Sequence, residues 1–268
     1  MLCETIEDYS MRHFMLNLKN NYLVMFFILS VSSCASDPNR IPENMPVDEI
    51  IKLANNSLVK KNYGRAADFF MEVNQFYPYS DEARNSLIEA AKAYHANSDL
   101  LNARLAAQEY LLIYSNNSDA PFAKYMIGLS YFDAIVDVNR DQGAALDALR
   151  EFEELIETYP DSQYVDMATK KFNLARAQLA GQEMTVGRFY LHREKYLAAI
   201  SRFEMVVKTY PQTPYFVEAL YRLIEANLSI GISKKAKENL KILQKRFPKS
   251  HWTSDAEELM NVVLLKDI

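Results

Sequence analysis

The chain has 268 residues, of which 49% are hydrophobic and 24% charged, and its formal net charge is −5. This is the balance of an ordinary globular protein, so it excludes a disordered chain and provides no basic footprint for nucleic acid. Six glycines and nine prolines are few for this length, and they favour long helices over a turn-rich β fold. Both cysteines, Cys3 and Cys34, precede the expected globular body, which therefore holds no disulfide framework or cysteine-based metal site.

The N-terminal region has the pattern of a secretory signal peptide. Arg12 and Lys19 precede an apolar run over residues 22–31. This run is too short to span a membrane, because a spanning helix needs about 20 apolar residues. It ends at residues 31–34, Val-Ser-Ser-Cys, where one apolar and two small residues precede cysteine as in the lipobox of bacterial lipoproteins. We therefore expect residues 1–33 to be a cleaved lipoprotein signal peptide.

Cys34 is accordingly the predicted lipidation site and the first residue of the mature protein. It would carry a diacylglycerol group and an N-linked acyl chain, which together suffice for stable anchoring. No other cofactor and no metal are expected. Ala35, rather than Asp, follows the cysteine, which favours the periplasmic face of the outer membrane. The alternative is an ordinary signal peptide with a coincidental cysteine. Residues 34–46 contain three prolines among polar residues and predict a flexible, extended tether.

Residues beyond the tether carry an internal repeat. One unit has Gly187, Tyr190, Ala199, Phe203 and Pro211 at the spacings of a tetratricopeptide repeat, a helix pair of about 34 residues. An aromatic residue followed by proline recurs four times, at Tyr77-Pro78, Tyr159-Pro160, Tyr210-Pro211 and Phe247-Pro248. Four further units keep part of the pattern, with Ala66 and Phe70, Ala103 and Ala107, Ala148 and Phe152, and Ala236 and Leu240.

The residue types have a physical reason. Small residues let two antiparallel helices approach closely, aromatic rings fill the groove between pairs, and proline ends the second helix. One pair cannot bury its apolar face alone, so several must stack. The sequence therefore predicts an all-α fold, an α-solenoid of about five tetratricopeptide-like helix pairs. A non-repetitive helical bundle, the alternative, leaves the recurring aromatic–proline pairs unexplained.

Two features predict a division of this solenoid. Residues 137–143 are polar and indicate a loop inside the third unit. Beyond Ser162 a helical pattern continues to about Gly181 and on towards Tyr190, which indicates a long connecting helix. We therefore expect an N-terminal repeat lobe over residues 47–135 and a C-terminal repeat lobe over residues 136–268.

The lipobox, the proline-containing tether and the five repeats together resemble the BamD-type outer-membrane protein assembly lipoproteins, over essentially the whole mature chain. The most specific stretches are residues 139–142 (Asn-Arg-Asp-Gln), 159–164 and 168–171. The insertion in the third repeat is a family trait. The resemblance implies a scaffold subunit of the outer-membrane β-barrel assembly machinery. Its C-terminal half would dock on the periplasmic domains of the barrel-forming subunit, its N-terminal half would receive unfolded outer-membrane proteins, and other assembly lipoproteins would be further partners.

The same resemblance places the docking arginine at Arg202, within residues 200–204 (Ile-Ser-Arg-Phe-Glu). It would pair with a carboxylate of the barrel-forming subunit, a contact that suits a planar guanidinium group. Because Arg202 directly precedes the core residue of the repeat, it should lie at the edge of the buried face. The alternatives are a solvated arginine, or a pair within the chain with Glu204 or Glu194.

Substrate capture is expected in the first repeat, at Phe76, Tyr77 and Tyr79. Exposed aromatic side chains beside a groove could bind a peptide that ends in an aromatic residue. The alternative places Phe76 and Tyr77 in the core or the turn. At this point the chain departs from family members that carry a glycine turn after the proline.

No catalytic chemistry is visible in the sequence. His95, His192 and His251 stand in no metal-binding motif, and His95 and His192 are expected at the surface. Glu153-Glu154 and Glu257-Glu258 are expected to be solvated helix-face charges. We therefore predict that the chain is not an enzyme. A different envelope repeat lipoprotein, which coordinates cell-wall synthesis or division, is the alternative function.

Overall fold

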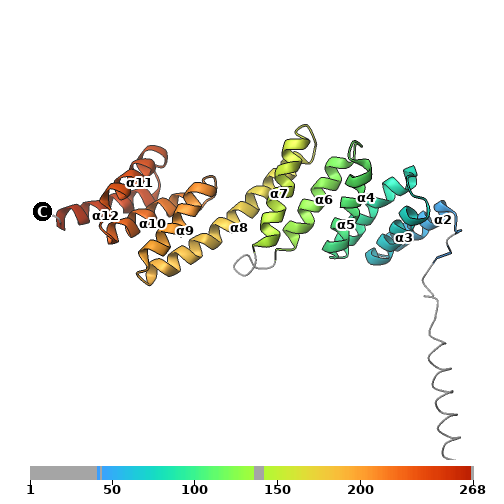
Figure 1. Cartoon of the computed structure of the whole chain (residues 1–268), viewed down its shortest axis with the longest axis horizontal. Coiled ribbons are helices and arrows are strands. Elements are labelled where there is room, and N and C mark those ends of the chain that lie inside the picture. Colours follow the sequence, from blue (N-terminus) through green and yellow to red (C-terminus); the bar gives the residue numbers. More distant parts are fainter. Residues whose placement is uncertain (1–40, 43, 136–141, 267–268) are drawn as a thin grey trace, which may run out of the picture. The chain divides into compact units, whose positions relative to one another are not determined.

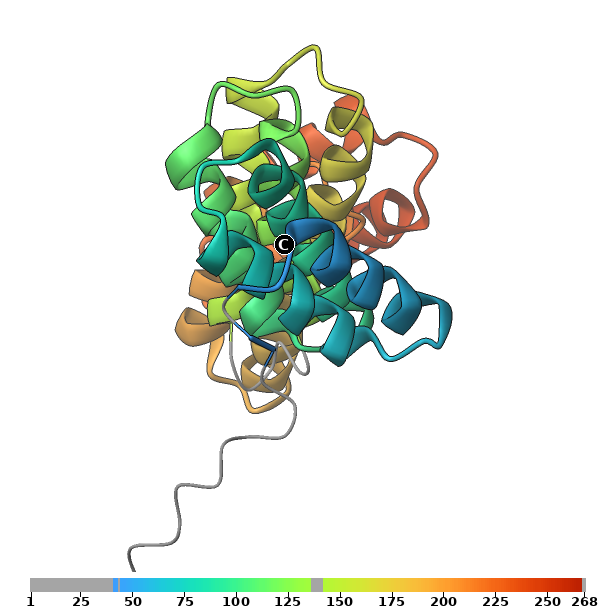
Figure 2. The same cartoon turned by 90° about the vertical axis from the view of Figure 1, so that its right-hand side faces the viewer.

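A computed structural model describes residues 41–42, 44–135 and 142–266 (Figure 1). The predicted signal peptide, Cys34, most of the tether and most of the predicted loop over 137–143 lie outside these residues. Every regular element in the described ranges is an α-helix (Figures 1 and 2). The helices are α2 (Val47–Val59), α3 (Tyr63–Phe76), α4 (Asp81–Ala96), α5 (Leu100–Tyr114), α6 (Ala120–Asp133), α7 (Gly143–Thr158), α8 (Val165–His192), α9 (Tyr196–Thr209), α10 (Phe216–Ser229), α11 (Ser233–Arg246) and α12 (His251–Lys266).

Successive helices pack against one another from α2 through α11, and α12 covers α10 and α11. Helices also meet the next but one, since α4 contacts α6 and α6 contacts α8. This is the contact pattern of stacked helix pairs, in which each pair touches its neighbours in the chain. The predicted all-α tetratricopeptide-like fold is confirmed. Residues 46–268 group as one unit by their contacts, and the division into two lobes stays a prediction.

The aromatic–proline pairs end the second helix of a pair, as the sequence predicts. Helices α3, α7, α9 and α11 each stop at the residue before the aromatic one. The aromatic residue then leaves the helical region, with φ between −123° and −134° in all four turns. Proline forces this change because its ring excludes the α conformation for the residue before it. In each turn a serine or threonine N–H then donates to the aromatic carbonyl, at Ser80, Ser162, Thr213 and Ser250.

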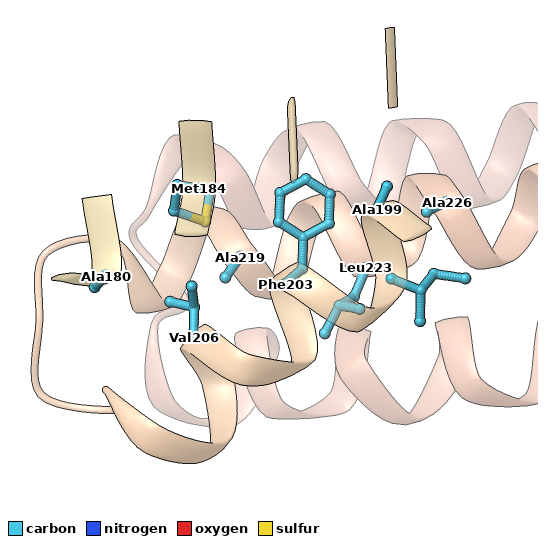
Figure 3. Close-up of a cluster of buried hydrophobic side chains, with 9 residues drawn as sticks. Ala180, Met184, Ala199, Phe203, Val206, Ala219, Leu223 and Ala226 are labelled. Carbon is cyan, nitrogen blue, oxygen red and sulfur yellow. The ribbon is translucent and has the colours of Figure 1, made fainter. Parts of the chain in front are cut away.

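In two helix pairs, an aromatic ring on the second helix packs directly on a glycine of the first helix. A Cβ atom at Gly187 of α8 would lie 2.8 Å from Cδ1 of Phe203 on α9. A Cβ atom at Gly128 of α6 would lie 2.7 Å from Cδ1 of Phe152 on α7. Real Cβ atoms do not approach so closely, so only glycine admits the ring. Figure 3 shows Phe203 among the buried side chains of this cluster, which include Met184, Ala199, Val206 and Leu223.

Helix α8 is the long helix that the sequence indicates. It runs without interruption through Gly181 to His192, a length of 28 residues. It packs against both α7 and α9, so the third and fourth repeats share this element. Arg202 on α9 is thereby held next to the C-terminal part of α8.

Candidate docking surfaces

Arg202 lies on α9 beside the buried ring of Phe203, at the boundary between the core and the solvent. Its side chain is 43% exposed, and its Nη1 donates to Oε2 of Glu183 on α8 at 3.1 Å. The carboxyl side chain of Glu183 is only 10% exposed. The arginine therefore has a partner within the chain, but this partner is Glu183 rather than Glu204 or Glu194. Sequence reasoning missed Glu183, although it lies one helical turn before Gly187, where Phe203 packs.

Arg202 and Glu183 share one hydrogen bond, whereas the nearby pair of Arg188 and Glu218 shares two. Arg188 on α8 binds Glu218 on α10 with two nitrogens, Nε to Oε1 at 2.8 Å and Nη2 to Oε2 at 2.6 Å. The Arg188 side chain is 40% exposed, close to the value for Arg202. A guanidinium group has five N–H donors in a planar fork. Arg202 thus directs one of them into its own chain and is geometrically able to offer others to a partner.

Burial and charge together set the titration of this region. Burial of the Glu218 carboxyl would by itself raise its pKa, but the hydrogen bond and charge of Arg188, with Arg222, lower it below the ordinary value. Burial raises the pKa of the Tyr210 hydroxyl, and the nearby charge of Glu183 adds to the effect. Tyr210 is therefore neutral at physiological pH, and Glu218 is ionised.

The three aromatic residues of the first repeat are in different environments. Phe76 ends α3 and Tyr77 follows it, and both are partly buried. Tyr79 is 79% exposed and has a φ of +66°, in the left-handed region that disfavours a residue with a side chain. The structure therefore presents most of the Tyr79 side chain to the solvent, while Phe76 and Tyr77 contribute partly to packing.

Two cavities lie close to the ends of α8, and sequence reasoning identified neither. One, of about 510 Å³, lies between α8 and the turn before α10, where Arg176 Nη2 donates to the carbonyl of Thr209. The other, of about 430 Å³, lies at the start of α9 and is lined mainly by apolar atoms of Tyr196, Leu197 and Ile230. Leu197 is 74% exposed. The first cavity combines residues 170–176 with residues 212–214, and the second combines residues 194–198 with Ile230, so each depends on a contact between distant segments.

The histidines and paired glutamates occupy structural or solvated positions. His95 Nε2 lies 3.0 Å from Oδ2 of Asp133, so it links α4 to α6 and is less exposed than the surface position that the sequence indicates. His192 is exposed. Glu154 shares Lys124 with Glu151 across α6 and α7. Among the described residues, no group of three or more His, Cys, Asp or Glu side chains is placed to hold a metal ion.

The helix pairs, the glycine–aromatic contacts and the aromatic–proline turns define a tetratricopeptide-type repeat protein. No helix in the described part of the chain is long and apolar enough to cross a membrane. A family model described as "Outer membrane lipoprotein" matches residues 43–243, and the chain belongs to this family.

The chain is similar to outer membrane protein assembly factors of several bacteria. The outer membrane protein assembly factor BamD of Caulobacter vibrioides is 36% identical over 235 residues, which cover 87% of this chain and 77% of the relative. The BamD of Rickettsia prowazekii is 32% identical over 247 residues, covering 89% and 94%. The BamD of Neisseria meningitidis serogroup A is 27% identical over 254 residues, covering 89% and 95%.

Proposed function

We propose that this chain is an outer membrane protein assembly factor, a non-enzymatic scaffold that docks the barrel-forming subunit of the assembly machinery and helps to receive unfolded outer-membrane proteins. The observation that carries the proposal is the similarity to assembly factors over most of both chains, with 36% identity over 235 residues in one case. The repeat fold supports it, because stacked helix pairs provide extended surfaces for other proteins.

Arg202 is the proposed contact to the barrel-forming subunit. Its single hydrogen bond to Glu183 and its 43% exposure support this role, because further N–H donors are able to reach a carboxylate of the partner. Glu183 would then orient the guanidinium group before binding, which lowers the entropy lost on docking. The exposed Leu197 and the apolar cavity beside it lie on the same helix and could seat an apolar side chain of the partner.

Tyr79 is the strongest candidate of the three aromatic residues for contact with an unfolded substrate. Its ring adds little to the core, and its left-handed backbone costs about 1–2 kcal/mol relative to glycine. Lys61, Ser98 and Glu194 adopt a similar positive φ at other turns, so the exposure of the ring, rather than this angle, singles out Tyr79. Phe76 and Tyr77 would form the partly buried floor beneath it. A Tyr79→Gly variant should therefore unfold at a higher urea concentration and bind a peptide with an aromatic C-terminus more weakly.

A peptide with a C-terminal alanine in place of the aromatic residue is the control for that binding measurement. Unchanged binding of the aromatic peptide by the Tyr79→Gly variant would remove Tyr79 from the proposed site. It would leave docking through Arg202 untouched.

Cys34 is proposed as the acylated anchor at the periplasmic face of the outer membrane. The family description as an outer membrane lipoprotein supports this location. In cells fed a radiolabelled fatty acid, the full chain should take up label, and the Cys34→Ala variant should take up none. Label retained by Cys34→Ala would contradict an anchor at this cysteine.

The function itself is tested by affinity capture of the acylated chain from detergent-solubilised envelopes. We expect the barrel-forming subunit among the captured proteins, and a weaker recovery by an Arg202→Gln variant. Arg202→Gln is preferable to charge reversal, because a new carboxylate beside the buried Glu183 would repel it and disturb the fold. Recovery of cell-wall synthesis or division proteins alone would overturn the proposal in favour of a different envelope scaffold.

A further inference from the structure

Helix α11 and the turn after it carry a concentration of positive charge in a chain whose net charge is −5. Between residues 233 and 249 a single carboxylate, Glu238, stands among the cations. These cations are Lys234, Lys235, Lys237, Lys241, Lys245, Arg246 and Lys249. The buried side of α11 is small by comparison and consists of Ala236 and Leu243.

Four of these lysines form one surface, which we call the lysine face: Lys234, Lys237, Lys241 and Lys245. At 100° per residue they fall within about 80° of one another, opposite the buried Ala236 and Leu243. All four are exposed. Within the described residues none of the four forms an ion pair. Lys235, which points to another side of the helix, is the one that bonds Glu204 on α9, at 3.3 Å.

The stability of α11 explains only Lys245 of the lysine face, because this residue lies in the last turn, where the helix dipole favours cations. Lys234 and Lys235 lie in the first turn, where the positive end of the helix dipole disfavours cations. The N-cap position is Ile232, which makes no side-chain capping hydrogen bond. Neighbouring lysines at a spacing of four residues, such as Lys237 and Lys241, also repel each other. Local rules broken without a compensating contact mark a surface kept for another purpose.

The chemistry of the face favours phosphate headgroups over a protein partner. Protein interfaces are depleted in lysine and enriched in arginine and aromatic residues. A lysine ammonium is a flexible point charge without the fixed fork of arginine, so it suits mobile anionic headgroups that present no defined geometry. Basic helical surfaces of this composition bind anionic lipid.

We propose that the lysine face of α11 binds the anionic phospholipid headgroups of the membrane to which the chain is anchored. This inference rests on the proposed function in one respect only, the location of the protein at a membrane. A polybasic surface and an acyl anchor are complementary signals, since each strengthens the membrane attachment that the other provides. The lysine face would thereby restrict the orientation of the C-terminal repeats at the membrane.

Amine acetylation followed by mass spectrometry tests this directly on the acylated protein. The protein is reconstituted in vesicles of phosphatidylcholine alone, or of phosphatidylcholine with phosphatidylglycerol, and each lysine's modification rate is measured. We expect the four lysines of the face to be modified several-fold more slowly on the anionic vesicles, with the effect lost at high salt. The internal controls, whose rates should not change, are the exposed Lys52, Lys60, Lys61 and Lys208.

Other results would overturn the proposal. Equal rates on both vesicles would exclude lipid binding by this face. Protection by inorganic phosphate on neutral vesicles would indicate a free phosphate site instead. Protection that requires the captured barrel-forming subunit would assign the face to a protein interface.

A variant pair supplies a second measurement, on the full chain with Cys34→Ser so that acylation does not dominate binding. Replacing the four lysines of the face with glutamine should weaken binding to anionic vesicles by about fivefold per lysine. The same replacement at the four control lysines, with an equal change of charge, should have a much smaller effect. Equal losses in the two variants would show that net charge alone governs binding. Capture of the barrel-forming subunit by the lysine-face variant should persist, which separates this inference from the proposed function.

Discussion

The pairs α8–α9 and α10–α11 occupy consecutive repeats but fill the same positions differently. In α8–α9 the ring of Phe203 lies on the bare backbone at Gly187. In α10–α11 the corresponding positions hold Ile224 and Leu240, two aliphatic side chains in one cluster. In α8–α9 the absence of a side chain at the glycine is thus offset by the large ring on α9, whereas α10 and α11 each contribute a side chain of intermediate size. The repeat pattern therefore constrains the sum of two side chains rather than either one alone.

The exposed sides of the second helices differ even more. Helix α9 presents Leu197 and Met205 to the solvent and holds Arg202 against a buried carboxylate. Helix α11 presents lysines. Because packing fixes only the inner side of each helix, the outer side is free to specialise. The functional surfaces of this chain are therefore expected where equivalent helices differ on their outer sides.

The largest expected effect comes from removing the ring that joins α8 to α9. Phe203→Ala should lower the free energy of unfolding by about 3–5 kcal/mol, because it deletes a fully buried aromatic side chain. Leu240→Ala should cost less, about 2 kcal/mol, because Leu240 is only partly buried. Urea unfolding of the two variants measures both values. Equal losses of unfolding free energy would contradict the difference in packing described for the two pairs.

Overpacking the same contact should have the next largest effect. Gly187→Ala should cost about 1–3 kcal/mol, since the new methyl group overlaps the ring of Phe203. Gly231→Ala is the matched control: nothing lies within 4 Å of its added Cβ, and its cost of about 1 kcal/mol would arise only from the φ of +79°. Combining Gly187→Ala with Phe203→Leu should restore part of the loss in thermal unfolding. Gly231→Ala combined with Phe203→Leu should show no such recovery.

A smaller, pH-dependent effect should come from the pair that ties α8 to α10. The pKa of Glu218 is lower in the folded chain than its ordinary value of 4.5, so folding favours the ionised form. The resulting stability is present above the ordinary value and is lost as the pH falls through the folded-state pKa. Urea unfolding of the wild type between pH 6 and pH 3 should therefore show a steeper loss than that of Glu218→Gln. Parallel curves would contradict the role assigned to Arg188.

Much of this fold was predictable from the sequence because its signals are local and repeated. The aromatic–proline pairs and the Gly187–Phe203 spacing are each contained within one helix pair, and the structure realises both as predicted. The 28-residue α8 was likewise indicated by an unpunctuated helical pattern.

The candidate sites were less predictable, since they depend on which side chains meet between helices. The partner of Arg202 within the chain is Glu183, 19 residues earlier. The sequence had suggested Glu204 or Glu194 because they lie closer to Arg202 along the chain. The strain at Tyr79 depends on a backbone angle that no residue pattern indicates. The lysine face could have been recognised from its spacing on a helix.

Docking through Arg202 is tested most directly by the affinity of purified acylated protein for the barrel-forming subunit. Arg202→Gln should weaken binding by about 30-fold, the effect expected for a hot-spot arginine. Arg188→Gln, which removes an equally exposed arginine that Glu218 already holds by two bonds, should stay within about twofold. Equal affinities for the wild type and both variants would contradict the docking surface proposed on α9.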